Sequence, residues 1–324
     1  MSRVDGLRLA SAHVDVDAFA REVQYYLSLT PRQLPSRYLY DALGSSLFEA
    51  ICHLPWYPIT RAERHLIETY RHDILDFAKQ PRAIIELGSG NGEKLALLLQ
   101  DAQASRTAHL IDVSATALAA ATSRLSDIPA VTIVTHQDQY EEGLNSVARL
   151  RPRGESALAL FLGSNIGNFD QPDAEAFLGS VRTSLRSGDT FLIGADLVKP
   201  EPMLLTAYDD PLGVTAAFDR NLLVRLNHEL GANFDLAGFV HRAVWNAEQS
   251  RVEMHLESRC RQAVAIPRAQ LDVTFEAGER IWTESSYKYE SVAFEAMLQR
   301  AGFAPGRRWI DPRSRFLLSL CRVN

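Results

Sequence analysis

The feature that most constrains the fold is an alternation of short apolar runs and amphipathic segments between residues 83 and 195. The apolar runs are 83–87, 108–112, 131–134, 157–162 and 190–195. The segments between them with helical spacing of apolar residues are 93–99, 115–125 and 173–185. Short apolar strands that alternate with helices are typical of a parallel sheet covered on both faces. The sequence therefore predicts an α/β fold.

The segments on either side of this alternation follow other patterns. On the N-terminal side, apolar spacing predicts helices over 15–29, 45–54 and 61–77, with Thr60 and Glu63 as a capping box for the third. On the C-terminal side we expect helices over 214–230 and 292–301, antiparallel strands over 240–244 and 252–256, and a strand over 316–322 that returns to the sheet. We predict one domain from residues 63–198 plus 287–324 and a second, α+β domain from residues 1–62 plus 199–286.

The composition excludes several classes of protein. With 46% hydrophobic and 23% charged residues, the chain of 324 residues is an ordinary globular sequence rather than a disordered one. Its net charge of −6 disfavours a nucleic-acid partner. Cys52, Cys260 and Cys321 form no CxxC pair, and no apolar run has the length of a signal-peptide core or a membrane span. We therefore expect a cytoplasmic protein with reduced thiols and no membrane partner.

A glycine-rich loop joins the first strand of the alternation to the helix that follows it. Its glycines are Gly88, Gly90 and Gly92, with Ser89 between the first two and Lys94 at the start of the helix. Glycines allow a tight turn and a close approach of the backbone to a ligand. The spacing G-x-G-x-G differs from the G-x-G-x-x-G of dinucleotide-binding loops. A pyrophosphate is therefore a poor fit to this loop.

Acidic residues follow or end three successive strands. Glu86 lies just before the glycines, where it suits a cationic amino group, and Asp112 is placed to accept hydrogen bonds from ribose hydroxyls. Asp138, with Gln139 beside it, is placed for an adenine. S-Adenosylmethionine has a cationic amino-acid end, a ribose and an adenine but no phosphate, so we predict this cofactor, with Lys94 near its carboxylate. No cluster of carboxylates or histidines has the spacing of a metal site, so no metal is predicted.

Motifs distributed along nearly the whole chain resemble those of the histidine Nα-methyltransferases of ergothioneine biosynthesis. They are residues 37–41 with 44–48, 54–55, 60–63, 86–94, 161–169, 195–199, 207–210, 213–216, 253–256 and 282–286. Three positions depart from the family pattern. Trp56-Tyr57-Pro58-Ile59 replaces Glu-Tyr-Tyr-Pro, Asn165 replaces a Thr, and Gln139 replaces a Phe.

The resemblance implies a Rossmann-like, S-adenosylmethionine-dependent methyltransferase sheet with a substrate domain, acting as a monomer. It implies transfer of three methyl groups to the α-amino nitrogen of free L-histidine, which gives the betaine hercynine. Carried over by position, the residues that hold the amino-acid end are Tyr40, Tyr57, Gly163, Asn168 and Tyr208, and those that line the imidazole pocket are Met254, Glu284 and Ser286. Tyr40 and Asn168 would orient the reacting nitrogen. We add Phe48 and Phe218 as aromatic walls near the amine.

Three other functions compete with this prediction. An enzyme of the same family could act on another amino acid, such as a tryptophan derivative, because an indole also carries a polar N–H. A cofactor-binding protein without turnover would have the same fold, but the presence of Tyr40, Asn168, Tyr208 and Glu284 argues against a decayed site. A nucleic-acid methyltransferase is disfavoured by the acidic charge and by the absence of the Pro-Pro-Tyr and Pro-Cys motifs.

Overall fold

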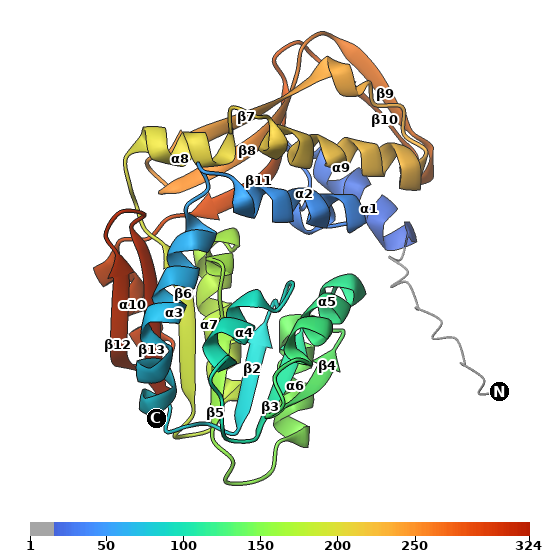
Figure 1. Ribbon diagram of the computed structural model, residues 1–324. Helices are drawn as coiled ribbons and strands as arrows, with labels where there is room; N and C mark the ends of the chain where they lie inside the picture. Colours follow the sequence, from blue (N-terminus) through green and yellow to red (C-terminus); the bar gives the residue numbers. More distant parts are fainter. Residues whose placement is uncertain (1–15) are drawn as a thin grey trace, which may run out of the picture.

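The computed structural model describes residues 16–324 and is built around a seven-stranded sheet (Figure 1). The strand order is β12-β13-β6-β5-β2-β3-β4. The parallel strands are β2 (Ala83–Leu87), β3 (Arg106–Ile111), β4 (Val131–His136), β5 (Ala157–Phe161) and β6 (Thr190–Asp196). The antiparallel edge is formed by β12 (Phe303–Asp311) and β13 (Phe316–Val323). Every residue of β2, β5 and β6 is buried, as the apolar runs predicted. The α/β class and the Rossmann-like sheet are confirmed.

Helices cover both faces of this sheet because successive residues of each strand point to opposite sides. The helices that pack with Ile84 and Leu158 are α3 (Ile59–Phe77), α4 (Glu93–Leu99) and α5 (Ala115–Leu125). Those that pack with Ile85 and Phe161 are α6 (Tyr140–Leu150), α7 (Gln171–Ser184) and α10 (Ser291–Arg300). The two apolar layers leave the carboxyl ends of the parallel strands along one edge of the sheet.

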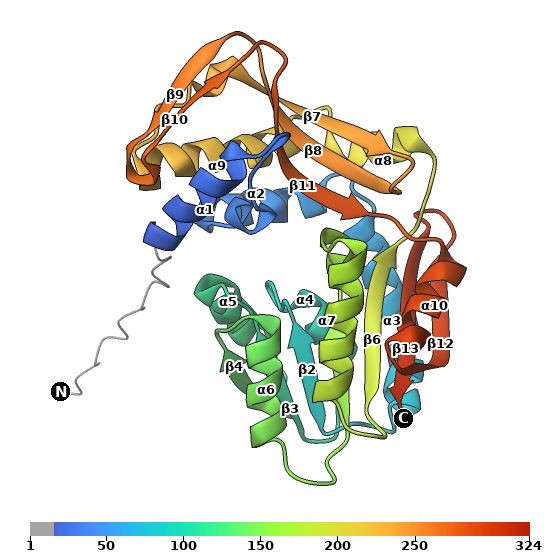
Figure 2. The same ribbon diagram turned by 180° about the vertical axis from the view of Figure 1, so that it is seen from behind.

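A second sheet lies beyond that edge, and Figure 2 shows it from behind. Its order is β1-β11-β8-β7, from β1 (Arg32–Gln33), β11 (Arg280–Tyr287), β8 (Arg251–Ser258) and β7 (Phe239–Asn246). The hairpin of β9 (Gln262–Ile266) and β10 (Leu271–Phe275) stands apart from it. The helices on this side are α1 (Val16–Ser28), α2 (Ala42–His53), α8 (Glu201–Tyr208) and α9 (Val214–Leu230). The N-terminal helices α1 and α2 lie beside α9, which is far away in sequence (Figure 1).

The chain passes between the two sheets in residues 54–58, 197–200 and 288–290. Two of these segments lie side by side, since Leu197 and Tyr289 form a parallel bridge. The boundaries of the two predicted domains stay a prediction. Within the described chain, residues 16–324, no helix is both long enough and apolar enough to span a bilayer. Cys52, Cys260 and Cys321 are free thiols.

The predicted capping box of the third helix is wrong. Helix α3 begins at Ile59, its N-cap residue is Pro58, and no side chain caps it. The Glu63 carboxylate is fully buried and instead accepts hydrogen bonds from Lys94 Nζ at 2.6 Å and from the Gly163 amide at 2.8 Å. Glu63 binds these two donors rather than capping its own helix, because a buried carboxylate needs hydrogen-bond donors.

Several elements begin earlier than predicted or were missed by the sequence analysis. Helix α2 begins at Ala42 rather than residue 45, because Asp41 accepts a hydrogen bond from the Gly44 amide and caps it. The predicted first helix includes Asp15, which lies outside the described residues. The helices and strands that were not predicted are α6, α8, β1, β9, β10 and β12. Strand β12 buries only Phe303 and β1 is two residues long, so neither has a clear apolar periodicity.

Candidate active site

The cofactor-binding region predicted from the sequence lies at the carboxyl ends of β2, β3 and β4. Gly88, Gly90 and Gly92 all have positive φ, at 72°, 50° and 72°, so the loop uses backbone conformations that favour glycine. The Gly90 amide donates to Asp112 Oδ2 at 3.1 Å, and the Ser114 amide donates to Oδ1 at 2.9 Å. The loop and the Asp112 carboxylate therefore form one connected rim above the sheet.

Glu86 is a buried carboxylate beneath this rim. Its side chain is 3% exposed, and Oε2 has no hydrogen-bond partner among the residues of the described chain. Burial raises the pKa of Glu86 to about 8, although the nearby Lys94 ammonium lowers it in part. Ser89 Oγ is likewise buried without a partner in residues 16–324. A cationic amino group would satisfy the orphan carboxylate oxygen, so this loop fits the amino-acid end of S-adenosylmethionine.

The other predicted cofactor residues lie at the same edge with different surroundings. Lys94 is paired with Glu63, and although burial alone would lower its pKa, the Glu63 carboxylate raises it. Asp138 and Gln139 follow β4 and are exposed, and Gln139 occupies the N-cap position of α6 without a side-chain cap. The structure thus brings Glu86, the glycines and Asp112 together and leaves the predicted adenine residues at the open end.

A pocket lies between this edge and the second sheet, and every predicted substrate residue lines it. Those residues are Tyr40, Phe48, Tyr57, Gly163, Asn168, Tyr208, Phe218, Met254, Glu284 and Ser286. The lining residues that sequence reasoning missed are Ile51, Ile59, Ser164, Asn165, Ala207 and Thr215. Four of these residues lie inside motifs shared with the family, so the resemblance could have identified them. They are Ser164, Asn165, Ala207 and Thr215. Ile59 lies in the segment that departs from the family pattern, whereas Ile51 carried no signal, because an apolar side chain on a helix looks the same whether it faces a core or a pocket.

The loop after β5 joins the pocket to the glycine loop. Gly163 has a φ of 84°, and a Cβ atom there would lie 3.1 Å from Lys94 Nζ. The 3₁₀ turn η2 (Asn165–Asn168) follows, and a Cβ atom on Gly88 would lie 3.2 Å from the Asn165 side chain. A group bound at the glycine loop would therefore lie next to a group bound in the pocket.

Glu284 and Ser286 line the pocket from alternate positions of β11, which share one face of the strand. They are 8% and 6% exposed, and Tyr40 Oη lies 3.4 Å from Glu284 Oε1. The register of β11 against β8 shifts between Trp282 and Glu284. Burial, reinforced by the Asp219 carboxylate, raises the pKa of Glu284 to about 8. The pocket therefore holds a carboxyl group that changes its charge close to neutral pH.

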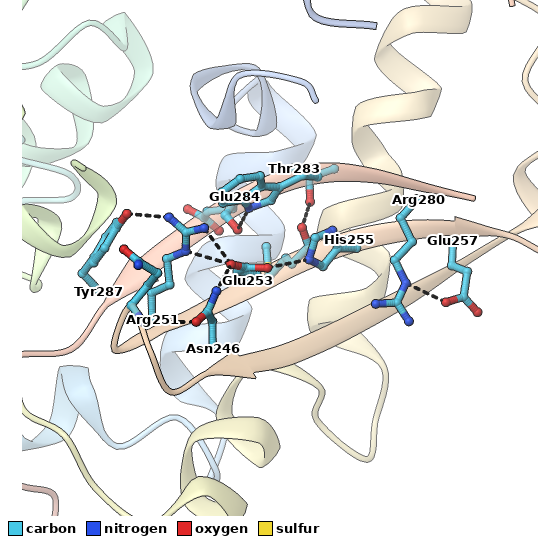
Figure 3. A network of polar contacts seen from close by, with 12 residues as sticks. Asn246, Arg251, Glu253, His255, Glu257, Arg280, Thr283, Glu284 and Tyr287 are labelled. Atoms are coloured by element: carbon cyan, nitrogen blue, oxygen red, sulfur yellow. Dashed lines mark hydrogen bonds and ion pairs between the residues drawn. The ribbon is translucent and has the colours of Figure 1, made fainter. Parts of the chain in front are cut away.

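A polar network at the strands β8 and β11 supports this arrangement (Figure 3). Arg251 donates to Glu253 at 2.8 Å and to the Tyr287 hydroxyl at 2.6 Å, and it stacks over the Trp282 ring at 4.3 Å. The Trp282 indole in turn donates to the Glu284 carbonyl at 3.0 Å. The indole hydrogen bond holds the backbone at Glu284, and the Arg251 side chain holds the indole and the Tyr287 hydroxyl beside it.

A cluster of aromatic rings lines the pocket. The centroid of Tyr40 lies 5.5 Å from Phe48 and 5.4 Å from Phe218, and Tyr57 lies 6.4 Å from Phe48. Tyr57 also lies 6.2 Å from Tyr208. Because aromatic faces attract cations, this group of side chains suits a substituted ammonium group.

Tyr208 is held at the end of α8 by a buried chain of polar groups. Its carbonyl lies 2.8 Å from His241 Nε2, and His241 Nδ1 lies 2.7 Å from Asp219 Oδ2. A carbonyl and a carboxylate both accept, so both ring nitrogens of His241 must donate and the imidazole is charged. Its pKa is raised: burial opposes this, but the Asp219 hydrogen bond and charge prevail. The Tyr208 hydroxyl contacts Ser286 Oγ at 2.7 Å and Lys288 Nζ at 2.7 Å, and Lys288 was not predicted.

Comparison with known proteins identifies the family. Residues 19–323 match the family model of the histidine-specific, S-adenosylmethionine-dependent methyltransferases. This chain belongs to that family. The histidine-specific methyltransferases that it resembles include the histidine N-alpha-methyltransferase of Mycolicibacterium smegmatis, which is 39% identical over 308 residues and 94% of each chain. The enzyme of the same name from Mycobacterium tuberculosis is 39% identical over 307 residues, again 94% of each chain.

A more distant relative is the L-tryptophan methyltransferase of Psilocybe serbica. It is 27% identical over 323 residues, which is 90% of this chain and 89% of that one. The predicted resemblance and the class of S-adenosylmethionine-dependent N-methyltransferase are confirmed. Among residues 16–324 no group of three His, Cys, Asp or Glu side chains could hold a metal ion, and the absence of a metal from the reaction stays a prediction.

Proposed function

We propose that this protein transfers methyl groups from S-adenosylmethionine to the α-amino nitrogen of free L-histidine, up to the trimethylated betaine. The observation that carries the proposal is the pairing of Glu284 and Ser286 on one face of β11 inside a pocket that adjoins the glycine loop. A carboxylate accepts from one ring N–H, and a hydroxyl serves the other ring nitrogen. The identity to histidine N-alpha-methyltransferases supports the same substrate.

The residues that would hold the cofactor are those of the glycine loop with Glu86 and Asp112. Glu86 would pair with the cationic amino group and Asp112 with the ribose hydroxyls, while Asp138 and Gln139 would lie at the adenine. S-Adenosylmethionine supplies a methyl group that its sulfonium charge already activates. The protein therefore needs chiefly to position the amine, a contribution worth up to about 7–11 kcal/mol in the best cases.

Tyr40 and Asn168 would orient the amine rather than deprotonate it. Burial and the neighbouring Glu284 raise the pKa of Tyr40 well above its ordinary value, so its hydroxyl keeps its proton at neutral pH. It can therefore donate a hydrogen bond or accept one, but it is no base. Tyr57, Asn168 and Tyr208 would hold the carboxylate, and the rings of Phe48 and Phe218 would stabilise the ammonium as it becomes more substituted.

The direct test is to incubate the purified protein with methyl-labelled S-adenosylmethionine and each of the twenty amino acids separately. We expect label in histidine only, and turnover of mono- and dimethylated histidine as well. Phenylalanine is expected to fail, because it would leave the buried Glu284 carboxyl group without a partner. Preferential labelling of tryptophan would overturn the histidine assignment and favour the alternative within the family. The monomeric state and cytoplasmic location also stay predictions.

A further inference from the structure

Three charged side chains form a buried cluster beneath the pocket. Asp196 accepts from Lys199 Nζ at 2.5 Å and pairs with Lys288 Nζ at 3.1 Å. Asp196, Lys199 and Lys288 are 1%, 6% and 3% exposed. Two ammonium groups thus share one carboxylate, and the cluster carries one excess positive charge. A buried excess charge is costly unless something compensates it.

The pocket itself does not cancel this charge when it is empty. The carboxyl group in the pocket is Glu284, and with a pKa of about 8, raised by burial, it is mostly neutral at pH 7. The Asp219 carboxylate is matched by the charged His241 ring. The excess positive charge of the cluster can therefore be compensated by a negatively charged ligand bound in the pocket.

Lys288 connects the charged cluster to two hydroxyl groups that line the pocket. Its three N–H groups point at Asp196, Tyr208 Oη at 2.7 Å and Ser286 Oγ at 2.9 Å. An ammonium can only donate, so both hydroxyl oxygens accept from it. The Tyr208 hydroxyl donates to Ser286 Oγ at 2.7 Å. The Ser286 hydrogen is therefore left to donate into the pocket.

We propose that Lys288 is a positioning residue that makes the pocket select a free carboxylate on its substrate. It turns a hydroxyl hydrogen of the Tyr208–Ser286 pair toward the ligand and supplies the excess positive charge behind it. The ligand atom seated there must accept a hydrogen bond, and an anionic acceptor is favoured over a neutral one. This inference rests on the proposed function for its substrate, an amino acid, and adds the reason why an amine or an amide of similar shape is rejected.

The test compares L-histidine with L-histidinamide, which has nearly the same shape but no negative charge. In the wild type we expect kcat/KM to favour histidine by about a hundredfold or more, as for a buried pair of charges. In Lys288→Met this ratio should fall to within about fivefold, chiefly because KM for histidine rises. The affinity for S-adenosylhomocysteine, measured by calorimetry, should stay unchanged, because Lys288 lies outside the glycine loop.

Lys199→Met is the matched control. Either substitution leaves Asp196 with one lysine, so neither creates an unpaired buried charge. Lys199→Met also removes the excess charge, but Lys199 hydrogen-bonds to Asp196 and to the Ser314 carbonyl instead of the pocket hydroxyls, so this variant keeps the oriented hydroxyls and should lose clearly less of the preference for histidine than Lys288→Met. If Lys288→Met does not fold, Lys288→Gln keeps two N–H donors without the charge and is expected to lose the preference as well.

A Lys288 variant that folds, binds S-adenosylhomocysteine and keeps the wild-type ratio would overturn the inference. So would an equal loss of the ratio in Lys199→Met. If the wild type methylates another amino acid, the proposed function is wrong but the inference is judged by the same ratio for that amino acid and its amide. If no free amino acid is accepted, both are wrong.

Discussion

The cofactor edge and the substrate pocket are built in opposite ways. The groups at the edge come from consecutive strand ends, at residues 86–94, 112–114 and 138–139, and each is placed by the strand directly before it. The pocket draws on residues 40–59, 163–168, 207–218, 254 and 284–286, which come from both sheets and their helices. The edge is half open to solvent, whereas Tyr208, Glu284 and Ser286 in the pocket are buried and Asn168 is its exposed polar residue.

This difference decides how each region responds to substitution. At the edge Asp112 accepts hydrogen bonds from the Gly90 and Ser114 amides, which are exposed or half-buried and can turn to solvent, so a change there should chiefly weaken ligand binding. In the pocket Tyr208, Ser286 and Lys288 hold one another and Tyr40 contacts Glu284, so a change at one leaves buried partners unsatisfied. We therefore expect larger effects in the pocket than at the edge.

The largest effect is expected from Glu284→Ala. Truncating one partner of a buried, charged hydrogen bond costs roughly 2–5 kcal/mol, so kcat/KM for histidine should fall by about 30-fold to several thousandfold. The affinity for S-adenosylhomocysteine should hardly change, because the glycine loop is untouched. Ser285→Ala, on the opposite face of β11, is the control and should keep full activity. The larger cavity would also favour an indole, so tryptophan should be assayed in parallel.

The next effect is expected at the open edge, from Asp112→Ala. Losing hydrogen bonds to a charged, half-buried group costs about 1.5–3 kcal/mol, so affinity for S-adenosylhomocysteine should fall roughly 10- to 100-fold. Asp138→Ala is the comparison, and since its side chain is exposed the loss should be smaller. Calorimetry on both variants measures this, and an unchanged affinity in Asp112→Ala would sink the assignment of the ribose site.

Two glycine substitutions in the loop distinguish the loss of stability caused by steric overlap from the loss caused by backbone strain. Gly90 and Gly92 both have positive φ, but a Cβ on Gly92 would lie 2.9 Å from Ala121, whereas one on Gly90 meets nothing within 4 Å. Each Ala should lose about 1 kcal/mol of stability from strain, and Gly92→Ala should lose about 1–3 kcal/mol more from overpacking. Denaturant unfolding of the two variants shows the difference, and equal losses would contradict this account of the Gly92 contact.

The smallest effect is a pH dependence of cofactor binding. Since burial raises the pKa of Glu86 to about 8, this carboxyl group is mostly protonated at pH 7 in the free protein. A cationic amino group binds the ionised form, so binding should release up to about one proton and tighten as pH rises from 6 to 8, at most tenfold per unit. Calorimetry in two buffers of different ionisation enthalpy counts the protons. Glu86→Gln should abolish the release, and release that persists in it would assign the proton elsewhere.

Glu63 shows why some of the site could not be predicted. Its position three residues after Thr60 gives it a plausible local role, as the partner in a capping box. In the structure it holds Lys94 and the Gly163 amide together, at the point where the glycine loop meets the pocket. Gly194 makes room for it, since a Cβ there would lie 2.1 Å from the Glu63 carboxylate. No pattern of spacing contains a contact between residues so far apart in the chain.

The sequence by itself determined the parallel sheet, the glycine loop and the acids at its strand ends. It could do so because strand periodicity and the loop that follows a strand are local, and parallel strands bring their carboxyl ends to one edge. Apart from Phe48 and Phe218, which were added as aromatic walls, the substrate residues were named only through the family resemblance, and local reasoning gave them an equally good role in a core or on the surface.

Only the tertiary structure decided which side chains share the pocket and which charges remain uncompensated there. The excess charge of Lys199, Asp196 and Lys288 exists because three elements bury them together away from water. The raised pKa of Glu284 has the same origin, since burial and the nearby Asp219 depend on packing rather than on sequence neighbours. Desolvation and Coulomb interactions act through space, and for that reason they are set by the fold.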